Sequence, residues 1–217
     1  MAPPKFNAKV AEAAYIANIT ELQASRIVEE AFLPKDFFNK DKGLTFSLAA
    51  CVLASFYYQK GSNYKKGFRI KVLKQFLQRT PNLSKVEDPV VFKTETKNDD
   101  FWRITVDDIM IDMGKMAIPV RERFECLQKI VTSPDVMHGE PVVIGTRIPA
   151  FFISFWAKEG LSVAQIREKF PSIQSDDLIQ AAIIWTDLNP FNGRPKRLSE
   201  LKPQWKVLLS TTRGLKL

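Results

Sequence analysis

The sequence has few of the residues from which catalytic and metal sites are built. Its 217 residues include one histidine, His138, and two cysteines, Cys51 and Cys126. The cysteines lie in apolar stretches without metal-ligand spacing, so we expect reduced thiols in a protein core. His138 precedes a Gly-Glu-Pro turn and has no second ligand or base partner near it in the sequence. Without a phosphate-binding loop, a dinucleotide fingerprint or a Ser/His/Asp set, we expect no enzyme activity, no metal and no cofactor.

Long apolar runs are also missing. The longest, residues 44–58, is interrupted by Thr45, Ser47 and Ser55 and is too short to cross a bilayer. The first residues, M-A-P-P-K-F-N, lack the apolar core of a signal peptide. We therefore expect a cytoplasmic protein without a membrane partner.

Acidic residues are scarce in two segments, and positive charge accumulates there. The formal net charge is +8. Residues 60–80 contain seven Lys and Arg and no acid, and residues 193–217 contain seven Lys and Arg with Glu200 as their acid. Positive charge gathered in this way implies a polyanionic or acidic partner.

Two short helices are expected near the N-terminus, over residues 8–17 and 20–32. Asn18 and the following Ile form a tight turn between them, and Thr20 with Gln23 forms a capping box at the start of the second helix. This is the helix-turn-helix pattern. The residues expected on the inner face of the second helix are Leu22, Ile27, Val28 and Ala31.

The outward side chains near the start of the second helix suit contact with DNA. Gln and Arg carry the hydrogen-bonding groups that pair with base edges in the major groove. The candidate DNA contacts on this helix are Thr20, Gln23, Ser25 and Arg26. Glu21, Glu29 and Glu30 argue against this interpretation, because carboxylates repel phosphate. A helical hairpin that only packs against a core is the alternative.

The first basic segment predicts a second phosphate-binding element. An apolar helix over residues 44–58 precedes it and is expected at the centre of the first core. The glycine-punctuated loop 61–67 is expected to lie along the DNA backbone as a wing, and residues 68–79 to form a basic amphipathic helix. The candidate phosphate contacts are Lys65, Lys66 and Arg69. A solvated helix face is the alternative.

Beyond Val90 the apolar pattern changes to alternation. The expected elements are paired strands over 90–95 and 102–106 around a polar turn at 97–100, a third strand over 108–113, and a helix over 120–130. Asp107, Asp108 and Asp112 alternate with apolar residues as outward strand positions do, so we interpret them as structural and not as metal ligands.

Residues 138–171 combine a glycine- and proline-rich segment with helical spacing. The first half reads H-G-E-P-V-V-I-G-T-R-I-P, and its glycines and prolines around the apolar run 142–144 predict a small β-hairpin. The second half predicts one short helix that ends at Gly160. A second begins at Ser162, where Gln165 completes a capping box.

Within this segment the strings G-E-P-V-V-I-G-T-R-I-P, G-L-S-V-A-Q-I and F-P-S-I resemble domain-of-unknown-function family 433, over residues 131–188. The resemblance implies a homeodomain-like three-helix module with a β-hairpin, as in bacterial VapB-type antitoxins. The rest of the chain resembles longer antitoxins with an N-terminal helix-turn-helix and a C-terminal G-R-P tail. That likeness implies a PIN-like (VapC-type) ribonuclease toxin as partner.

The basic tail at 191–217 permits two functional interpretations. Its G-R-P string resembles an AT-hook core, which lays Arg in the DNA minor groove. It also resembles the antitoxin tail, whose guanidinium would pair with the carboxylates that hold Mg²⁺ in a PIN-like nuclease. The aromatic and aliphatic residues of the tail argue against a merely solvated basic segment. The candidate toxin contacts are Arg194, Pro195, Lys196, Arg197, Trp205 and Leu208.

These patterns predict an α+β protein that is mainly α with a small β-sheet. The expected domains are a helix-turn-helix DNA-binding domain (1–85), a β-rich connector (86–130), the family-433 module (131–190) and an extended basic tail (191–217). The preferred hypothesis is an antitoxin that inhibits a ribonuclease toxin and represses its own operon. It would bind operator DNA as a homodimer and the toxin as a hetero-oligomer. The alternative is a DNA-binding transcriptional regulator without a toxin partner.

Overall fold

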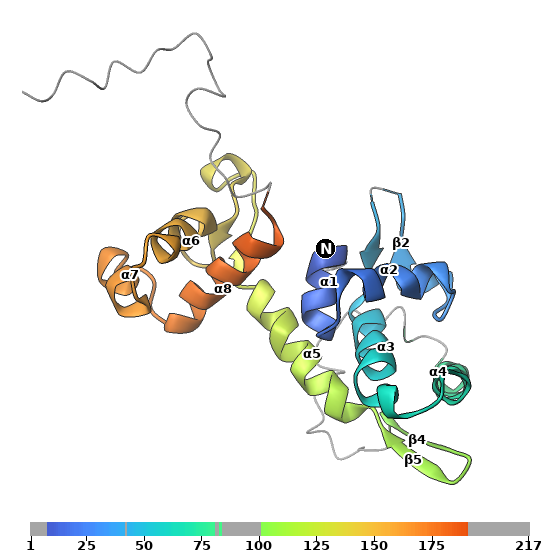
Figure 1. Ribbon diagram of the computed structural model, residues 1–217. Helices are drawn as coiled ribbons and strands as arrows, with labels where there is room; N and C mark the ends of the chain where they lie inside the picture. The colour runs from blue at the N-terminus through green and yellow to red at the C-terminus, as the bar shows by residue number, and fades with distance from the viewer. Residues whose placement is uncertain (1–7, 42, 81–82, 84–100, 191–217) are drawn as a thin grey trace, which may run out of the picture. The chain divides into compact units, whose positions relative to one another are not determined.

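The computed structural model describes residues 8–41, 43–80, 83 and 101–190, and it divides into two compact units (Figure 1). The first unit is residues 1–129 and the second is residues 130–217. Both are built mainly from helices with short antiparallel strands, which confirms the α+β class. In the described ranges, every helix is too short or too polar to cross a lipid bilayer.

The described part of the first unit alternates helices with short strands. In chain order the elements are β1 (Ala8–Lys9), α1 (Val10–Ala17), α2 (Glu21–Glu29), the 3-10 helix η1 (Lys35–Phe37), β2 (Phe38–Asn39), β3 (Thr45–Phe46), α3 (Leu48–Tyr58), the 3-10 helix η2 (Lys60–Asn63), α4 (Lys66–Arg79), β4 (Arg103–Val106), β5 (Ile109–Asp112) and α5 (Gly114–Leu127).

Helix α3 forms the centre of this unit, as its apolar sequence predicts. Ser47 caps its N-terminus by accepting a hydrogen bond from the Ala50 amide at 3.2 Å, and every residue from Leu48 to Tyr57 is buried. Small side chains fill the space between α1, α2 and α3 and let the three helices pack closely; they are Ala13, Ala17, Ala24, Ala50 and Ala54. Cys51 is buried here, and burial raises the pKa of its thiol to about 12.

A small sheet precedes α3 where the sequence predicted the start of a helix. β3 pairs antiparallel with β1 and with β2, and the strand order is β1-β3-β2. Phe46 lies opposite Ala8 on one side and Phe38 on the other, and its side chain is buried. Thr45 and Phe46 therefore belong to a hairpin, and the helix begins only after the Ser47 cap.

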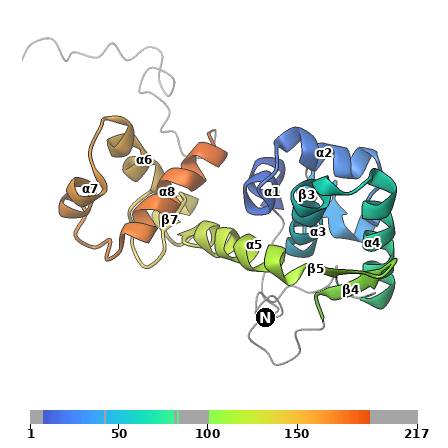
Figure 2. The same ribbon diagram turned by 60° about the horizontal axis from the view of Figure 1, so that its bottom comes forward.

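The hairpin β4–β5 packs beside α4 (Figure 2). Its turn is made by Asp107 and Asp108, whose φ values of 49° and 64° suit a two-residue hairpin loop of type I′. These two aspartates are turn residues and not outward strand positions as expected. Trp102, just before β4, stacks on Phe76 of α4 with 5.5 Å between ring centroids. The predicted strand 90–95 and turn 97–100 lie outside the described residues.

The loop expected as a wing, residues 61–67, is instead helical for most of its length. Its first part belongs to η2, and α4 already begins at Lys66. Gly61 is buried, and a Cβ placed there would lie 2.8 Å from the Phe56 carbonyl oxygen. Glycine is required because the backbone packs against α3, not because the segment reaches outward.

The second unit contains the predicted glycine-rich turn and capped helices. Its described elements are β6 (Ile130–Val131), the 3-10 helix η5 (Met137–Gly139), β7 (Val142–Val143), α6 (Ala150–Lys158), α7 (Val163–Lys169) and α8 (Asp176–Leu188). β7 pairs antiparallel with β6, and the chain then turns back at Gly145, where the Val143 amide donates to the Ile148 carbonyl at 2.9 Å. Ser162 and Gln165 form the expected capping box of α7.

The core of the second unit is aliphatic and lies between α6, α7, α8 and the β6–β7 ladder. α6 and α8 make the most extensive helix contact. The fully or nearly fully buried members are Ile130, Val143, Ala150, Ile153, Ile166, Ile173, Ile179 and Ala182. β-Branched Ile dominates this set, and its stiff side chain loses little freedom on burial.

Candidate nucleic-acid interface

Local hydrogen bonds fix the turn between α1 and α2. Asn18 adopts the left-handed conformation with φ 55° and ψ 49°, and the Ile19 amide donates to the Ala14 carbonyl at 2.9 Å. The Gln23 amide donates to the Thr20 hydroxyl at 3.1 Å, while the Thr20 amide donates to the Gln23 side-chain oxygen at 3.0 Å. Asn tolerates the left-handed region and the reciprocal cap satisfies exposed amides, so this sequence holds the two helices at a defined angle.

The cap also assigns different roles to the four candidate residues of α2. Thr20 and Gln23 are occupied with each other, so their first role is to position the helix. Ser25 is half-buried, and Arg26 is exposed. Of the four candidates, Arg26 is thus the exposed residue whose side chain does not take part in the cap.

Helix α2 is rotated from the orientation that its pattern predicted. Ala24 and Ile27 face the core, whereas Leu22 is 61% exposed. Ala31 is also exposed, with φ 50°, because the helix ends at Glu29. Leu22 and Ala31 were expected to face inward, and this expectation is wrong. The close contact of α2 with α1 and α3 selects the smaller Ala24 for the core.

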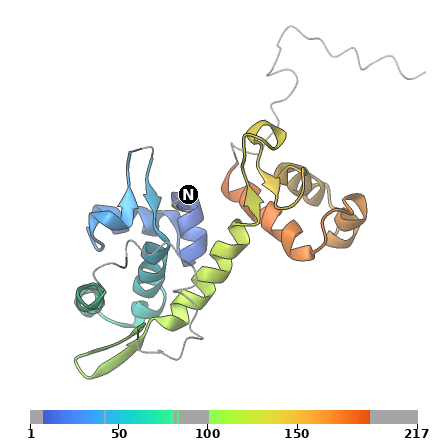
Figure 3. The same ribbon diagram turned by 180° about the vertical axis from the view of Figure 1, so that it is seen from behind.

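A hairpin of β2 and β3 projects beside these helices (Figure 3). Its loop carries Lys40. The Asp41 amide donates to the Asn39 side-chain oxygen at 2.7 Å, which tightens the loop, and Gly43 has φ 109°. Lys40 is exposed, with its ammonium 5.9 Å from the centre of the Phe38 ring. This hairpin was not predicted, although N-K-D-K-G between two apolar segments is a turn signal.

The cations of α4 are more occupied than their sequence suggested. Lys66 pairs with Glu30 at the end of α2, and this hydrogen bond raises the pKa of Lys66. The Arg69 guanidinium lies 4.4 Å from the centre of the Tyr57 ring and donates to the Tyr57 carbonyl at 2.9 Å. Three residues were predicted to contact phosphate. Arg69 is part of the packing between α3 and α4, Lys66 is held in an ion pair, and Lys65 is exposed.

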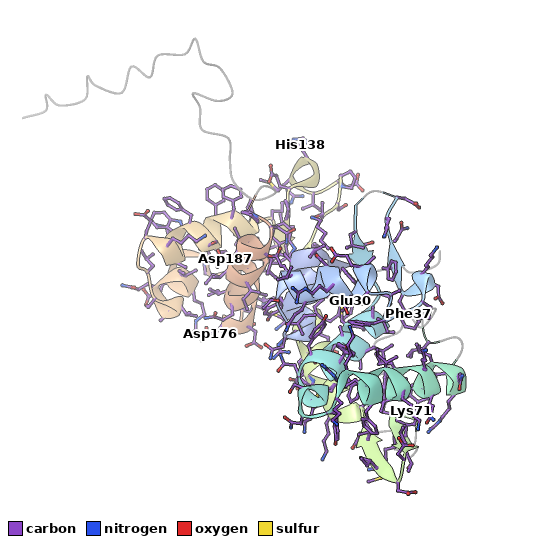
Figure 4. All side chains as sticks on the ribbon, turned by 45° about the vertical axis from the view of Figure 1, so that its right-hand side comes forward. Glu30, Phe37, Lys71, His138, Asp176 and Asp187 are labelled. Atoms are coloured by element: carbon purple, nitrogen blue, oxygen red, sulfur yellow. The ribbon has the colours of Figure 1, made fainter. Side chains whose placement is uncertain are left out.

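Lys71, farther along α4, pairs with Asp107 in the β4–β5 turn (Figure 4). The positive charge that the sequence concentrates over residues 60–80 is therefore neutralised in part by acids from elsewhere in the chain. Both side chains of this pair are about half exposed, so the pair contributes little to stability.

The remaining polar candidates are exposed, and the two aspartates of the second unit are engaged in ion pairs. His138 is exposed on η5 with φ 56°, at a distance from Asp176 and Asp187 (Figure 4). Asp176 pairs with Arg167 at 3.0 Å, and Asp187 with Lys158 at 2.8 Å. Within the described part of the chain, no group of three or more His, Cys, Asp or Glu residues is placed to hold a metal ion.

Apolar side chains are exposed on the second unit. Phe152 and Phe155 are 44% and 49% exposed, and they lie three residues apart on one face of α6. Met137 and Ile144 are also exposed. The candidate toxin contacts Arg194, Pro195, Lys196, Arg197, Trp205 and Leu208 lie outside the described residues.

Comparison with known proteins relates the second unit to a described family. Residues 130–184 match the model of the family described as protein of unknown function DUF433, as the resemblance implied. The chain is also similar to the uncharacterized protein y4eO of Sinorhizobium fredii (strain NBRC 101917 / NGR234), with 28% identity over 212 residues. That similarity covers 94% of this chain and 91% of the relative. No solved structure matches the chain.

Proposed function

We propose that the first unit binds double-stranded DNA as a winged helix-turn-helix. The observation that carries this proposal is the combination of two helices joined by a fixed turn with a hairpin directly after them. A helix presented in this way enters the major groove, which is wide enough for it, while a hairpin with a basic tip follows the phosphate backbone. The formal net charge of +8 supports a polyanionic partner.

The exposed side chains of α2 would contact bases, and those of the β2–β3 hairpin would contact phosphate. Arg26 on α2 supplies the donors that pair with a guanine edge, and the exposed Leu22 offers an apolar contact to a thymine methyl group. Lys40 in the hairpin loop supplies a phosphate contact that does not depend on sequence. Glu21 and Glu29 repel phosphate, so they favour a pose in which the start of α2, and not its whole length, meets the groove.

Binding to a promoter would require two copies. A single helix of this length reads only a few base pairs, whereas a two-fold dimer reads two half-sites about one helical turn apart. We therefore propose that the protein binds as a homodimer to an inverted repeat upstream of its own gene.

Fluorescence anisotropy with the duplex upstream of the coding sequence, and a scrambled duplex of equal length, tests this proposal. Arg26→Gln should weaken binding to the upstream duplex by roughly 1–3 kcal/mol and leave binding to the scrambled duplex nearly unchanged. Lys40→Gln should weaken both and lower the salt slope by about one. Arg167→Gln makes the same change of charge in the second unit and should have no effect.

Two outcomes would contradict DNA binding by this surface. One is affinity for the upstream duplex that does not fall with salt, which would place the protein among purely structural interaction proteins. The other is unchanged affinity in both Arg26→Gln and Lys40→Gln, which would leave the G-R-P tail as an AT-hook to be tested by removing residues 198–217.

A second candidate function is inhibition of a PIN-like ribonuclease as an antitoxin. The exposed Phe152 and Phe155 on α6 favour a protein partner for the second unit, because neighbouring aromatic side chains are typical anchors of protein interfaces. The match of residues 130–184 to family 433 supports it through the resemblance to VapB-type antitoxins. In this proposal the tail arginines would enter the acidic site of the nuclease in place of its metal.

Co-expression with a small acidic protein from the adjacent reading frame tests the antitoxin proposal. A stable complex and loss of ribonuclease activity are expected from the unaltered chain. Arg194→Glu combined with removal of residues 198–217 should abolish inhibition, and Phe152→Glu with Phe155→Glu should weaken the complex. Arg26→Gln is the control and should inhibit normally. Intact inhibition by the tail variant would refute the tail mechanism, and no complex at all would refute the antitoxin proposal.

A further inference from the structure

The first unit has an open cleft whose volume is about 420 Å³, a size typical of small-molecule sites. Four parts of the chain meet there: the turn after α1, the end of α3, η2 and one face of α5. The cleft is thus built from segments that are more than 100 residues apart in the sequence, and its shape depends on the packing of α5 against the first helices.

Two cations line this cleft, and no acidic residue is among the described residues that do. Lys60 comes from η2 and Arg123 from α5. Lys60 is exposed and has no carboxylate at ion-pair distance in the described part of the chain. Arg123 makes one long hydrogen bond, to the Ile16 carbonyl at 3.5 Å, although a guanidinium has five N–H donors. Two uncompensated cations in a concave site attract an anion.

Neutral polar groups and an apolar wall complete the cleft. Gln59 and Asn63 supply side-chain amides, and the Gln59 amide nitrogen donates to the Asn18 carbonyl, which holds the rim in place. Met116 and Pro119 lie one turn apart on α5 and form the apolar side. An inorganic ion would leave this wall unused, whereas an organic anion would cover it.

From these groups we infer that the cleft binds a small organic anion. Its carboxylate or phosphate group pairs with Lys60 and Arg123, its polar atoms meet the side-chain amides, and its carbon skeleton lies against Met116 and Pro119. The site is separate from the proposed contacts at Arg26 and Lys40, and it does not depend on DNA binding.

Isothermal titration calorimetry of the full chain tests this inference. Because no DNA is present, the result can be interpreted even if the proposal of DNA binding is wrong. The probes are adenosine monophosphate and citrate, which carry phosphate and carboxylate groups, and adenosine as the neutral counterpart. We expect at least one anion to bind with Kd of about 1 mM or tighter, and adenosine not to bind.

Substitution of the cations locates the site. Lys60→Gln and Arg123→Gln should each weaken anion binding about tenfold, because each removes one charge-assisted hydrogen bond. Lys115→Gln makes the same change on an exposed part of α5 and should bind like the unaltered chain. Circular dichroism checks that Arg123→Gln folds. If Arg123→Gln does not fold, the comparison of Lys60→Gln with Lys115→Gln still locates the site, because Lys60 is exposed.

Three results would overturn the inference. The first is that neither anion binds at about 10 mM. The second is that adenosine binds as tightly as adenosine monophosphate. The third is that Lys60→Gln binds the anion as tightly as Lys115→Gln, which would place any bound anion elsewhere on the chain.

Discussion

Gly61 and Gly67 are six residues apart, yet the structure predicts opposite effects for their replacement by alanine. A Cβ at Gly61 would lie 2.8 Å from the Phe56 carbonyl oxygen and 2.9 Å from the Arg69 Cδ. The first of these atoms is backbone, and the second belongs to a side chain held by Tyr57, so neither moves away easily. We expect Gly61→Ala to lower the free energy of unfolding by about 1–3 kcal/mol, the usual cost of overpacking.

Gly67 provides the matched control because it lies in the first turn of α4, where a Cβ would meet no atom within 4 Å. Alanine there reduces the freedom of the unfolded chain and should raise the free energy of unfolding by up to about 1 kcal/mol. Denaturant unfolding followed by circular dichroism measures both variants. Any separate transition of the second unit should not move and serves as an internal reference. A Gly61→Ala protein as stable as the original would refute the packing of η2 against α3.

Three further predictions concern caps, pH and thiol reactivity. Thr20→Ala and Ser162→Ala each remove a capping hydroxyl and should lower the free energy of unfolding by about 1 kcal/mol in thermal melts, whereas unchanged melts would contradict the two capping boxes. Burial raises the pKa of Cys51 from 9.0 to about 12, and burial, with Cys126 beside it, raises that of Tyr15 from 10.0 to about 12. Both groups stay protonated in the folded chain while the unfolded chain ionises. The contribution of these two groups to the free energy of unfolding is therefore complete below pH 9 and should be lost as the pH rises to about 12. A free energy of unfolding that does not change over this pH range would contradict the burial of both side chains. A thiolate-directed reagent should label Cys51 more slowly than Cys126 in the native chain and equally in denaturant, and faster native labelling of Cys51 would show that α3 is not the core helix.

Much of the local structure followed from short-range chemistry. The caps at Thr20 and Ser162 and the turns at Asn18 and Gly145 depend on residues at most a few positions apart. Such interactions form wherever the sequence places the partners, so their positions were predictable. The family-433 segment was predictable for the same reason, since its glycines and prolines mark its turns.

The errors came from residues whose partners are distant in the sequence. Thr45 and Phe46 belong to an apolar run that suits a helix. They form a strand instead, because β1 and β2 provide backbone hydrogen-bonding partners on both sides of it. Leu22 fits the helical pattern of an inner face, yet close helix packing prefers Ala24 there. The four-residue difference between the predicted start of a helix at residue 44 and its observed start at Leu48, like the rotation of α2, is decided by packing with distant segments that a local stretch of sequence does not contain.

The candidate site shows the same division. The concentration of lysine and arginine over 60–80 is a property of the sequence, and the prediction of a polyanionic or acidic partner rested on it. Which of those cations can meet a partner is a matter of tertiary structure. Lys66 reaches Glu30 and Lys71 reaches Asp107, each 36 residues away, while Arg69 stacks on Tyr57.

Local sequence was enough to predict the caps at Thr20 and Ser162, the turn between α1 and α2, and the resemblance of the second unit to the family that residues 130–184 match. The tertiary structure was needed to show that the hairpin at 38–46, and not the loop at 61–67, stands beside α2, and that Lys60 and Arg123 line one cleft. The physical reason is that helix propensity and capping act within one or two turns, whereas strand pairing, ion pairing and clefts require distant segments to be brought together by burial of a shared core.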